Sequence, residues 1–159
     1  MSSVELRDVI ESDLASFWAQ QLDEVANHMA AFTVESPTDR DAFDDRWWRI
    51  FADDTLNKKT ILLDGEVVGS IFCHRWFGDP EVAYGIDRPH WGKEVATAAL
   101  TRFLEEIEER PLYARAAGDN LGSIRVLEKC GFRLTAHERA FANARGEEIE
   151  EAVFVLGGT

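Results

Sequence analysis

The chain has 159 residues, of which 45% are hydrophobic and 30% charged, a composition typical of an ordered globular protein and not of a disordered one. Its formal net charge of -13 argues against nucleic acid or an anionic membrane as the main partner, because both require a basic protein face. The charge is compatible with a cationic substrate such as an amine, and solubility alone also explains it.

Neither a membrane span nor a secretory signal is evident in the sequence. No apolar run approaches the roughly 20 residues that cross a bilayer, and residues 1–10 have neither the basic nor the apolar region of a signal peptide. Cys73 and Cys130 do not resemble a disulfide framework. We therefore expect a cytoplasmic protein, and the absence of repeats and linkers predicts a single domain over residues 1–159.

The first third of the chain predicts one strand and two helices. Residues 4–9 alternate apolar and polar side chains, as a strand does. A helix is expected to begin at Ser12 and Asp13, which have N-cap side chains, and to run through Leu22. A second helix is expected after Thr38, because the apolar residues that follow it recur at helical spacing.

A β-hairpin and a further strand come next. Residues 60–76 contain two β-rich runs on either side of Asp64 and Gly65, a pair suited to a type I′ turn because both central residues need positive φ. Residues 81–87 form another strand, which Pro89 brings to an end.

The second half of the chain alternates helices and strands. Four elements follow in order: a helix from Lys93 to the residues before Pro111, a strand at 112–117, a helix at 120–130, and a hairpin of strands 132–142 and 147–156. Gly131 is a natural C′ residue for the second of these helices. The whole order predicts a mixed α/β (α+β) arrangement around one sheet.

The starts of the two helices in the second half of the chain carry residues suited to binding a ligand. Gly92 and Lys93 precede the first of these helices, and the free backbone N–H groups of a helix start attract phosphate. Gly92 would allow the phosphate to approach the backbone closely, and Lys93 would add a positive charge. A turn glycine and a solvated lysine explain them equally well. Glu94 follows Lys93, so this is not a P-loop. At the second helix start, Asn120 and Ser123 can either cap the helix or bind a ligand amide.

Two segments together carry a resemblance to the GNAT superfamily of acetyl-CoA-dependent N-acetyltransferases: AYGIDRPHWGKEVATAALTRFL and DNLGSIRVLEKCGF. The chain most resembles the branch that includes the Rim-type N-terminal acetyltransferases of ribosomal proteins. The resemblance is strongest over residues 81–134 and weak before Leu62. It implies the GNAT fold, in which a central, mostly antiparallel sheet is splayed at the acetyl-CoA site and flanked by about four helices.

The resemblance implies where acetyl-CoA would bind. Its pantetheine arm would pair with the strand near Tyr84 and its pyrophosphate would lie on the N–H groups of the loop and helix start that follow. The implied cofactor-binding residues are Gly85, Ile86, Trp91, Gly92, Lys93, Val95, Ala96, Thr97, Asn120, Ser123 and Lys129. No metal is expected, because the four histidines (His28, His74, His90 and His137) show no ligand spacing.

One residue departs from the family pattern Q/R-x-x-G-x-G/A. Trp91 stands at its first position and Ala96 at its last, but Glu94 stands where the central glycine belongs. Two interpretations remain open. Glu94 offers negative charge where the phosphate would lie and so weakens cofactor binding, or its side chain turns outward beside Lys93.

The resemblance implies direct transfer of an acetyl group to the primary amine of a small molecule or a protein N-terminus. The amine, with a pKa of about 10.4, must lose a proton, and the departing thiolate needs a proton or a hydrogen bond. Many relatives use a tyrosine for the second task at the position of Leu127, whereas Rim-like relatives point to Ser123. The catalytic candidates are Ser123, Glu81 and Tyr84.

The base and the acceptor site are less defined by the sequence. Glu81 is one candidate base, acting through water, and it forms the expected substrate site together with His74 and Trp76. His137 and Glu138 are further candidates, although a solvent-facing role explains each of these side chains. The aromatic cluster Trp47, Trp48 and Phe51 and the segment NHMAAF (residues 27–32) are expected in the core and acceptor-side wall. An acidic groove, formed for instance by Asp23, Glu24, Glu35 and Asp39, would favour a polyamine or another cation.

An alternative function is a catalytically degenerate acyl-CoA-binding or protein-interaction module. Glu94 and the leucine at position 127 motivate it, because both depart from what an active relative has. Relatives are often monomers or dimers, so we expect a monomer or a homodimer.

Overall fold

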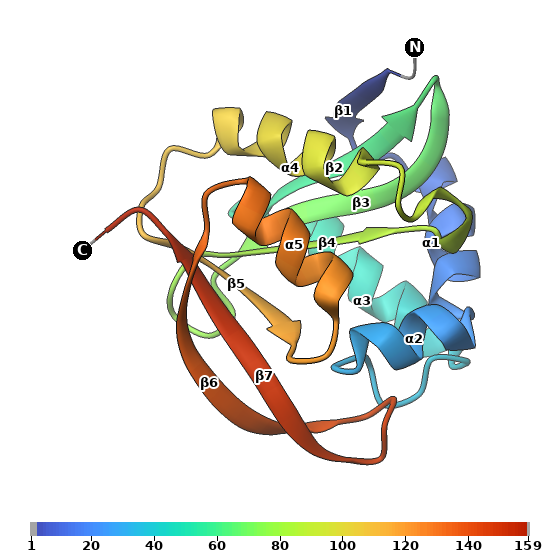
Figure 1. Cartoon of the computed structure of the whole chain (residues 1–159). Helices are drawn as coiled ribbons and strands as arrows, with labels where there is room; N and C mark the ends of the chain where they lie inside the picture. Colours follow the sequence, from blue (N-terminus) through green and yellow to red (C-terminus); the bar gives the residue numbers. More distant parts are fainter. Residues whose placement is uncertain (1–2, 159) are drawn as a thin grey trace.

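Figure 1 shows the computed structural model of the chain, which describes residues 3–158. The strands are β1 (Val4–Asp8), β2 (Asn57–Leu63), β3 (Glu66–His74), β4 (Glu81–Ile86), β5 (Leu112–Ala117), β6 (Arg133–Ala142) and β7 (Glu147–Leu156). The helices are α1 (Leu14–Gln21), α2 (Glu24–Ala30), α3 (Arg40–Ala52), α4 (Val95–Glu106) and α5 (Leu121–Lys129), with the 3₁₀ turns η1 (Glu11–Asp13) and η2 (Arg88–His90).

The strands form one seven-stranded sheet in the order β1-β2-β3-β4-β5-β7-β6. All neighbouring pairs are antiparallel except β4 and β5, which run parallel and pair only at Glu81 and Tyr113. A hydrogen bond of 2.9 Å from the Tyr113 N–H to the Pro80 carbonyl closes this junction. Beyond it the two strands diverge, which confirms the expected mostly antiparallel sheet splayed after the start of β4.

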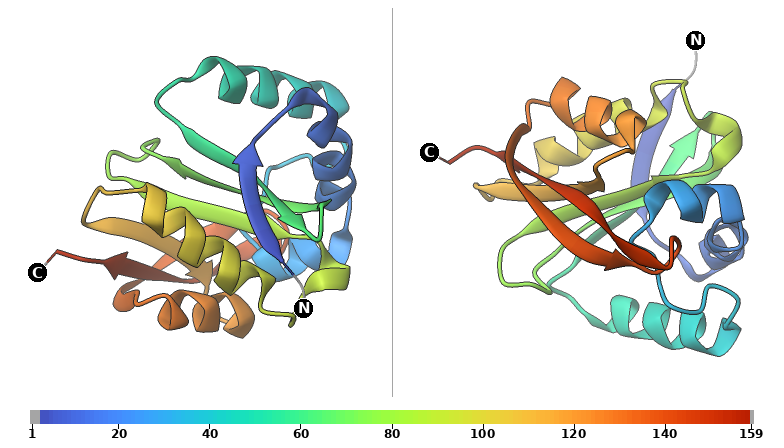
Figure 2. Two further views of the ribbon diagram at one scale, coloured as in Figure 1. Left: turned by 90° about the horizontal axis from the view of Figure 1, so that it is seen from above. Right: turned by 60° about the horizontal axis from the view of Figure 1, so that its bottom comes forward.

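Helices cover both faces of the sheet (Figure 2, left). On one face, α4 and α5 bury the larger core, which includes Leu100, Phe103 and Leu127. On the other face, α1 and α3 bury a smaller cluster around Phe43 and Trp47. Side chains alternate between the two faces along a strand. Each side chain of β4 and β5 therefore points either to the face covered by α4 and α5 or to the opposite face.

The turn signals of the sequence are confirmed. Asp64 and Gly65 have φ of 50° and 86°, as a type I′ turn between β2 and β3 requires. Gly131 ends α5 with φ of 92°. The N–H of Phe132 bonds to the Leu127 carbonyl at 3.0 Å, which is the long bond of a Schellman motif.

The N-terminal helices differ from the expectation in number and in their caps. Residues 3–158 contain five α-helices, because an additional short helix, α2, follows the end of the first expected helix at Leu22. Asp23 begins α2 by accepting the N–H groups of Val25 and Ala26 as its N-cap. Asp39, and not Thr38, caps α3.

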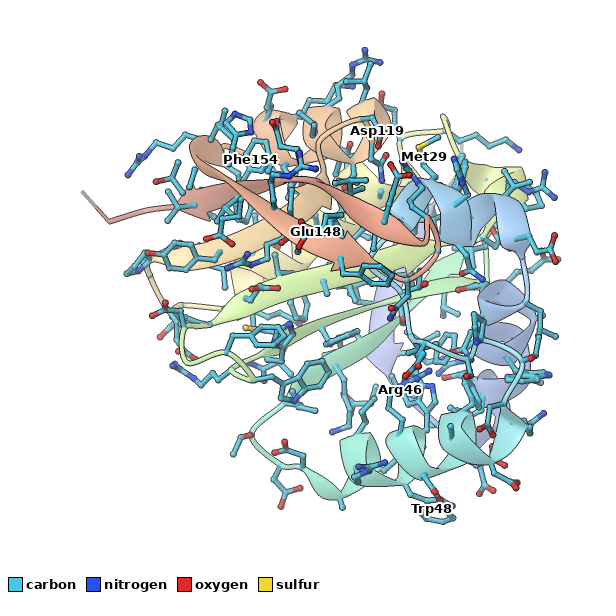
Figure 3. All side chains as sticks on the ribbon, turned by 90° about the horizontal axis from the view of Figure 1, so that it is seen from below. Met29, Arg46, Trp48, Asp119, Glu148 and Phe154 are labelled. Atoms are coloured by element: carbon cyan, nitrogen blue, oxygen red, sulfur yellow. The ribbon has the colours of Figure 1, made fainter. Side chains whose placement is uncertain are left out.

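Two other side chains in this region also lie elsewhere than expected. Asp13 is not a capping side chain for α1 but is buried against Arg7. Trp47 is buried as expected, whereas Trp48 is 68% exposed on the outer face of α3 and is no part of the core (Figure 3). No helix within residues 3–158 is both long and apolar enough to span a membrane.

Candidate active site

The start of α4 presents backbone N–H groups that have no partner among residues 3–158. The backbone N–H groups of Val95, Ala96 and Thr97 donate no hydrogen bond, and the first bond of the helix joins the Ala98 N–H to the Glu94 carbonyl at 3.0 Å. Unpaired N–H groups at a helix start concentrate partial positive charge and favour an anion.

The loop before α4 leaves open space beside its backbone. Gly92 has φ of 76°, and a Cβ built there would meet no atom within 4 Å. Lys93 is exposed next to it. Trp91 folds back and donates its Nε1–H to the Ile86 carbonyl at 2.8 Å, so it fixes the loop to the end of β4.

Glu94 has a left-handed backbone, with φ of 62° and ψ of 13°, at the N-cap of α4. This conformation favours glycine, because a side chain with a Cβ is strained there. The Glu94 carboxylate accepts a hydrogen bond of 2.7 Å from Lys129 Nζ at the end of α5. That hydrogen bond and charge lower the pKa of Glu94. The side chain therefore turns towards Lys129, another cofactor candidate, and stays largely exposed.

Tyr84 and Ser123 meet on the face covered by α4 and α5. The Tyr84 hydroxyl lies 3.0 Å from Ser123 Oγ. Burial raises the pKa of Tyr84 to about 12, against the opposing effect of the Ser123 hydrogen bond. Asn120 caps α5 by accepting the Ser123 N–H at 3.3 Å. Leu127 is packed in the core, so its side chain belongs to the fold and not to this pair.

Glu81 lies on the opposite face of β4, in front of His74. His74 Nδ1 accepts the backbone N–H of Trp76 at 3.3 Å, which leaves Nε2 as the donor towards Glu81 Oε2, 3.5 Å away. The Trp76 indole stacks on the His74 ring with centroids 4.2 Å apart. The structure thus brings the three expected substrate residues together, with His74 only 4% exposed and screened by Trp76.

Arg115 on β5 gathers three carboxylates on this face. Its guanidinium lies 3.2 Å from Glu81, 2.7 Å from Glu138 and 3.2 Å from Glu151. Burial favours a higher pKa for Glu81, but His74 and Arg115 outweigh it and hold the pKa below its ordinary value. For Glu151 burial prevails, and its pKa is raised in spite of Arg115.

A cleft of about 490 Å³ opens between the splayed strands on the face of Glu81. Its lining consists of Ala30, Phe32, Phe77, Glu81, Arg115, Ala116, Ala117 and Glu151. The two carboxylates outnumber the one guanidinium, so the cleft suits a cationic ligand. His74 and Trp76 do not line it. Phe32 belongs to residues 27–32, which were expected in the acceptor-side wall. Arg115, Glu151 and Phe77 were not expected in the site: the only signal for Arg115 and Glu151 was their alternation along predicted strands, and Phe77 lies in a loop.

One wall of the cleft is held by the turn between β6 and β7. Arg145 in this turn donates to the His28 carbonyl of α2 at 2.6 Å and pairs with both oxygens of Asp119. Next to it, Ala31 has φ of 66° and ψ of -56°, and the Phe32 N–H bonds to the Ala30 carbonyl at 2.7 Å. This strained γ-turn places Ala30 and Phe32 in the cleft lining.

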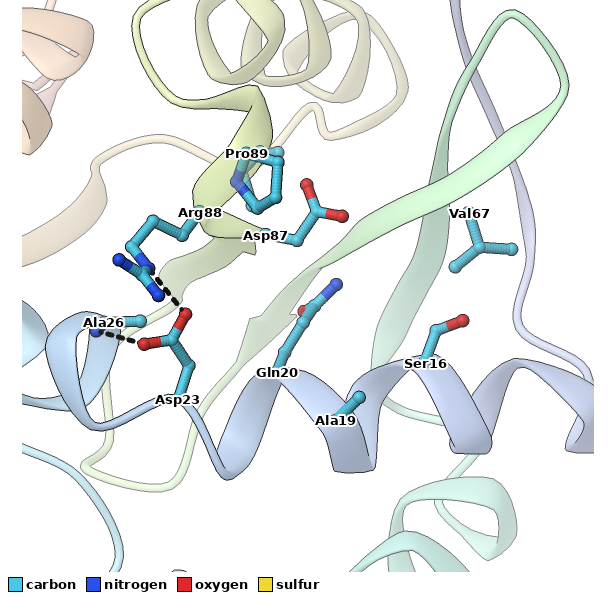
Figure 4. A pocket seen from close by; sticks show the side chains of 10 residues that line it. Ser16, Ala19, Gln20, Asp23, Ala26, Val67, Asp87, Arg88 and Pro89 are labelled. Atoms are coloured by element: carbon cyan, nitrogen blue, oxygen red, sulfur yellow. Dashed lines mark hydrogen bonds and ion pairs between the residues drawn. The ribbon is translucent and has the colours of Figure 1, made fainter.

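A second cavity, of about 250 Å³, lies between α1, β3 and the residues after β4 (Figure 4). The ion pair between Arg88 and Asp23, 2.9 Å long, borders it. Asp23 is also the N-cap of α2, and Asp39 accepts the Ala42 N–H as the N-cap of α3. These two aspartates were expected to make the acceptor groove acidic. They serve as helix caps, and the cleft takes its charge from the glutamates around Arg115.

The remaining candidates lie outside the cleft lining. His137 pairs with Glu150 at 2.8 Å, with both side chains about half exposed. Glu138 is 52% exposed beside Arg115. In the part of the chain that the structure describes, no group of three or more His, Cys, Asp and Glu residues could hold a metal ion.

Comparisons with known proteins agree with this geometry. The family model for the acetyltransferase (GNAT) domain matches residues 3–133. No curated protein sequence matches the chain. Solved structures of similar fold include the spermidine N-acetyltransferase of Vibrio cholerae in complex with CoA and spermine, with 16% identity, a TM-score of 0.77, and coverage of 96% of this chain and 95% of that one.

Two further structures come from the branch suggested by the sequence. RimJ of Mycobacterium smegmatis in complex with CoA-disulfide has 20% identity and a TM-score of 0.79, covering 96% of this chain and 81% of that one. The ribosomal-protein-alanine N-acetyltransferase of Brucella melitensis has 20% identity and a TM-score of 0.79, covering 96% and 98%. Identities this low establish the shared fold and leave the substrate to be argued from the site.

Proposed function

This chain belongs to the GNAT acetyltransferase family, and we propose that it transfers an acetyl group from acetyl-CoA directly to the primary amine of a small cationic molecule. The observation that carries the proposal is the cleft at the split of β4 and β5. It has the Glu81 and Glu151 carboxylates on the acceptor face, and the Tyr84–Ser123 pair lies on the opposite face of the sheet.

The residues around α4 fit acetyl-CoA. Free N–H groups from Val95 to Thr97 suit its pyrophosphate, and the open space at Gly92 allows a close approach. Within residues 3–158, the β5-side edge of β4 has no partner strand beyond Glu81, so its backbone is available to the pantetheine amides. When bound, acetyl-CoA supplies the activated acetyl group as a thioester. Lys93 and Lys129 would add positive charge for its phosphates.

The two faces of the split perform different tasks in this proposal. On the acceptor face, the carboxylates attract an ammonium group and hold it next to the opening between the strands. Backbone N–H groups of β4 stabilise the oxyanion. On the other face, the Tyr84 hydroxyl stays protonated at neutral pH because its pKa is about 12. With Ser123 beside it, Tyr84 can donate a hydrogen bond to the departing sulfur.

A small cation is favoured over a protein N-terminus as the acceptor. The cleft is bounded by Phe32 and Phe77, measures about 490 Å³ and carries more negative than positive charge. A polyamine such as the spermine in the Vibrio cholerae complex has these properties, whereas a peptide needs an open and less charged groove. Free Cys73 and Cys130 support a reducing compartment, and we place the activity in the cytoplasm.

The first test is calorimetric titration of the purified protein with acetyl-CoA and, separately, with free CoA. Micromolar binding supports the site at α4, and an amine panel of polyamines, monoamines and short peptides then follows, with release of free thiol as the readout. The degenerate-module alternative rests on the Glu94–Lys129 pair, which engages two groups at the expected phosphate site. No binding up to millimolar cofactor would favour that alternative and contradict the enzyme.

A further inference from the structure

Glu151 is the carboxylate in the cleft that keeps an oxygen free. Its side chain is 12% exposed, and only Oε1 is engaged, at 3.2 Å from Arg115. Within residues 3–158, Oε2 has no hydrogen-bond partner. Glu81, the other carboxylate of the lining, has both oxygens engaged, Oε1 by Arg115 and Oε2 by His74. A group that is to receive a proton needs an accessible lone pair, and in this cleft Glu151 alone offers one that is not already shared.

From this geometry we propose that Glu151 accepts the proton of the acceptor ammonium, with Arg115 and Glu81 as positioning residues. The inference rests on the acetyltransferase function proposed above and names the base that the sequence left open. Arg115 holds one oxygen of Glu151, a residue of the cleft lining, and leaves the other oxygen free. Glu81, fixed between His74 and Arg115, remains ionised and retains the ammonium while Glu151 becomes neutral.

The charges around Glu151 favour proton uptake. The groups that face it are Arg115 from β5, Glu81 from β4 and Glu138 from β6. Burial raises the pKa of Glu151, the two glutamates act in the same direction, and Arg115 alone opposes them. The apolar neighbours Ala30 and Phe32 on the far wall contribute no charge. A base whose pKa lies closer to the working pH is more effective.

The proton and electron balance is complete with acetyl-CoA as the only co-substrate. Glu151 takes one N–H proton from the ammonium, which leaves a lone pair on nitrogen. That pair forms the new C–N bond to the acetyl carbon, and the C–S bond breaks with its electrons on sulfur. A second N–H proton ends on sulfur, giving the free thiol. Glu151 then releases its proton to water, so one proton is produced for each acetyl group transferred.

The test compares E151Q with the matched control E150Q. Glu150 neighbours Glu151 on β7, but its side chain points to the other face and pairs with His137. We expect E151Q to lower kcat/KM about 10²-fold to 10⁴-fold and to remove the acid limb of its pH profile, with binding of acetyl-CoA unchanged. E150Q should retain the activity and the limb. E151D, which keeps a carboxylate, should retain the limb at a reduced rate.

A second readout needs no ligand. The protein is labelled with ¹³C at the glutamate carboxyl carbons, and the Glu151 resonance is identified as the one missing in E151Q. We expect this resonance to titrate with a pKa above the ordinary glutamate value of about 4.3. Titration at or below that value, or an active E151Q with an unchanged pH profile, overturns the inference while leaving the proposed function intact. A wild-type protein that acetylates none of the amines contradicts the proposed function itself, and the inference falls with it. If E151Q fails to fold, the inference is tested by the pH profile of E151D and by the titration of the Glu151 resonance in the wild-type protein.

Discussion

The Glu94 carboxylate lies 2.7 Å from the ammonium group of Lys129 and joins the start of α4 to the end of α5. Both residues stand where acetyl-CoA phosphates are proposed to bind. At such a site the pair would compete with the cofactor in two ways, because it places negative charge beside the helix start and it occupies a lysine. The left-handed backbone of Glu94 explains why a glycine suits this position.

Replacing Glu94 by Gly should strengthen acetyl-CoA binding. The substitution removes a charge that opposes the phosphate and frees Lys129, and it also suits the backbone. We expect Kd to fall about twofold to fivefold in calorimetry at low salt, which is the range for one charge near a helix N-terminus. E94Q, which removes only the charge, should show a smaller part of the gain. An unchanged Kd in both variants would place the pair outside the cofactor site.

Asp13 should be the strongest electrostatic contributor to stability. Its side chain is 2% exposed and accepts two bonds of 2.8 Å from Arg7, one of 3.0 Å from the Ile10 N–H and one of 2.6 Å from Thr60. Asp13→Ala leaves these donors without a partner, so the free energy of unfolding in urea should fall by about 3–5 kcal/mol. The control D44A breaks the exposed Arg40–Asp44 pair and should cost less than about 1 kcal/mol.

The same network makes stability depend on pH. Burial of Asp13 opposes ionisation, but Arg7, Ile10 and Thr60 outweigh it and hold the pKa of Asp13 below its ordinary value. The stabilisation is therefore present above the unfolded-state pKa, near 3.9, and is lost as the pH falls through the lower folded-state pKa. The urea midpoint of the wild-type protein should drop below about pH 4, and D13A should lack that part of the drop. Parallel pH profiles of the two proteins would contradict this.

The parts of the structure that depend on local chemistry were predictable from sequence. The turn at Asp64 and Gly65 and the helix end at Gly131 are set by the φ of one or two residues, and both were identified. The splay also followed from the family resemblance. Caps were less predictable. Asp13 and Thr38 both have side chains suited to an N-cap. Asp13 instead forms a buried ion pair with Arg7, and Asp39 caps α3 in place of Thr38.

The charged cluster that lines the acceptor cleft around Glu81 was not predictable, because it depends on strand pairing over long separations. Glu81, Arg115 and Glu151 stand far apart in the sequence and meet only because β5 lies between β4 and β7. Glu151 belongs to an acidic run that resembles a solvated strand face. The pairing of β7 with β5 turns alternate members of that run inward, and the sequence alone does not specify which partner strand β7 has.

Tyr84→Phe should slow the chemical step without weakening cofactor binding. The variant keeps the ring in the core but removes the hydroxyl that faces Ser123. A hydrogen bond to a developing charge contributes about 1.5–3 kcal/mol, so kcat should fall about tenfold to a hundredfold while the Kd of acetyl-CoA stays the same. Tyr113→Phe, at the other tyrosine of the chain, is the matched control and should behave as wild type. Equal kcat in Y84F and Y113F would exclude Tyr84 from the reaction.

Arg145→Ala should loosen the acceptor wall without affecting the cofactor. Arg145 ties the β6–β7 turn to His28 and Asp119, and the Ala144 N–H bonds to the Ala31 carbonyl at 3.1 Å. Without the guanidinium, Ala31 can leave its positive-φ conformation, which stores about 1–3 kcal/mol, and Phe32 moves with it. We expect the KM for the amine to rise about threefold to tenfold, since 1.4 kcal/mol corresponds to tenfold.

The control for this variant is Arg139→Ala in the same hairpin, because among residues 3–158 the Arg139 side chain donates only to the Glu148 carbonyl of that hairpin. It should leave both the KM for the amine and the Kd for acetyl-CoA as in the wild-type protein. The cofactor loop at Gly92 lies outside the contacts of Arg145, so a change in the Kd of acetyl-CoA in R145A would indicate a general loss of structure and not a displaced wall. An amine KM that is the same in R145A and R139A would show that the γ-turn at Ala31 holds its shape without the clamp.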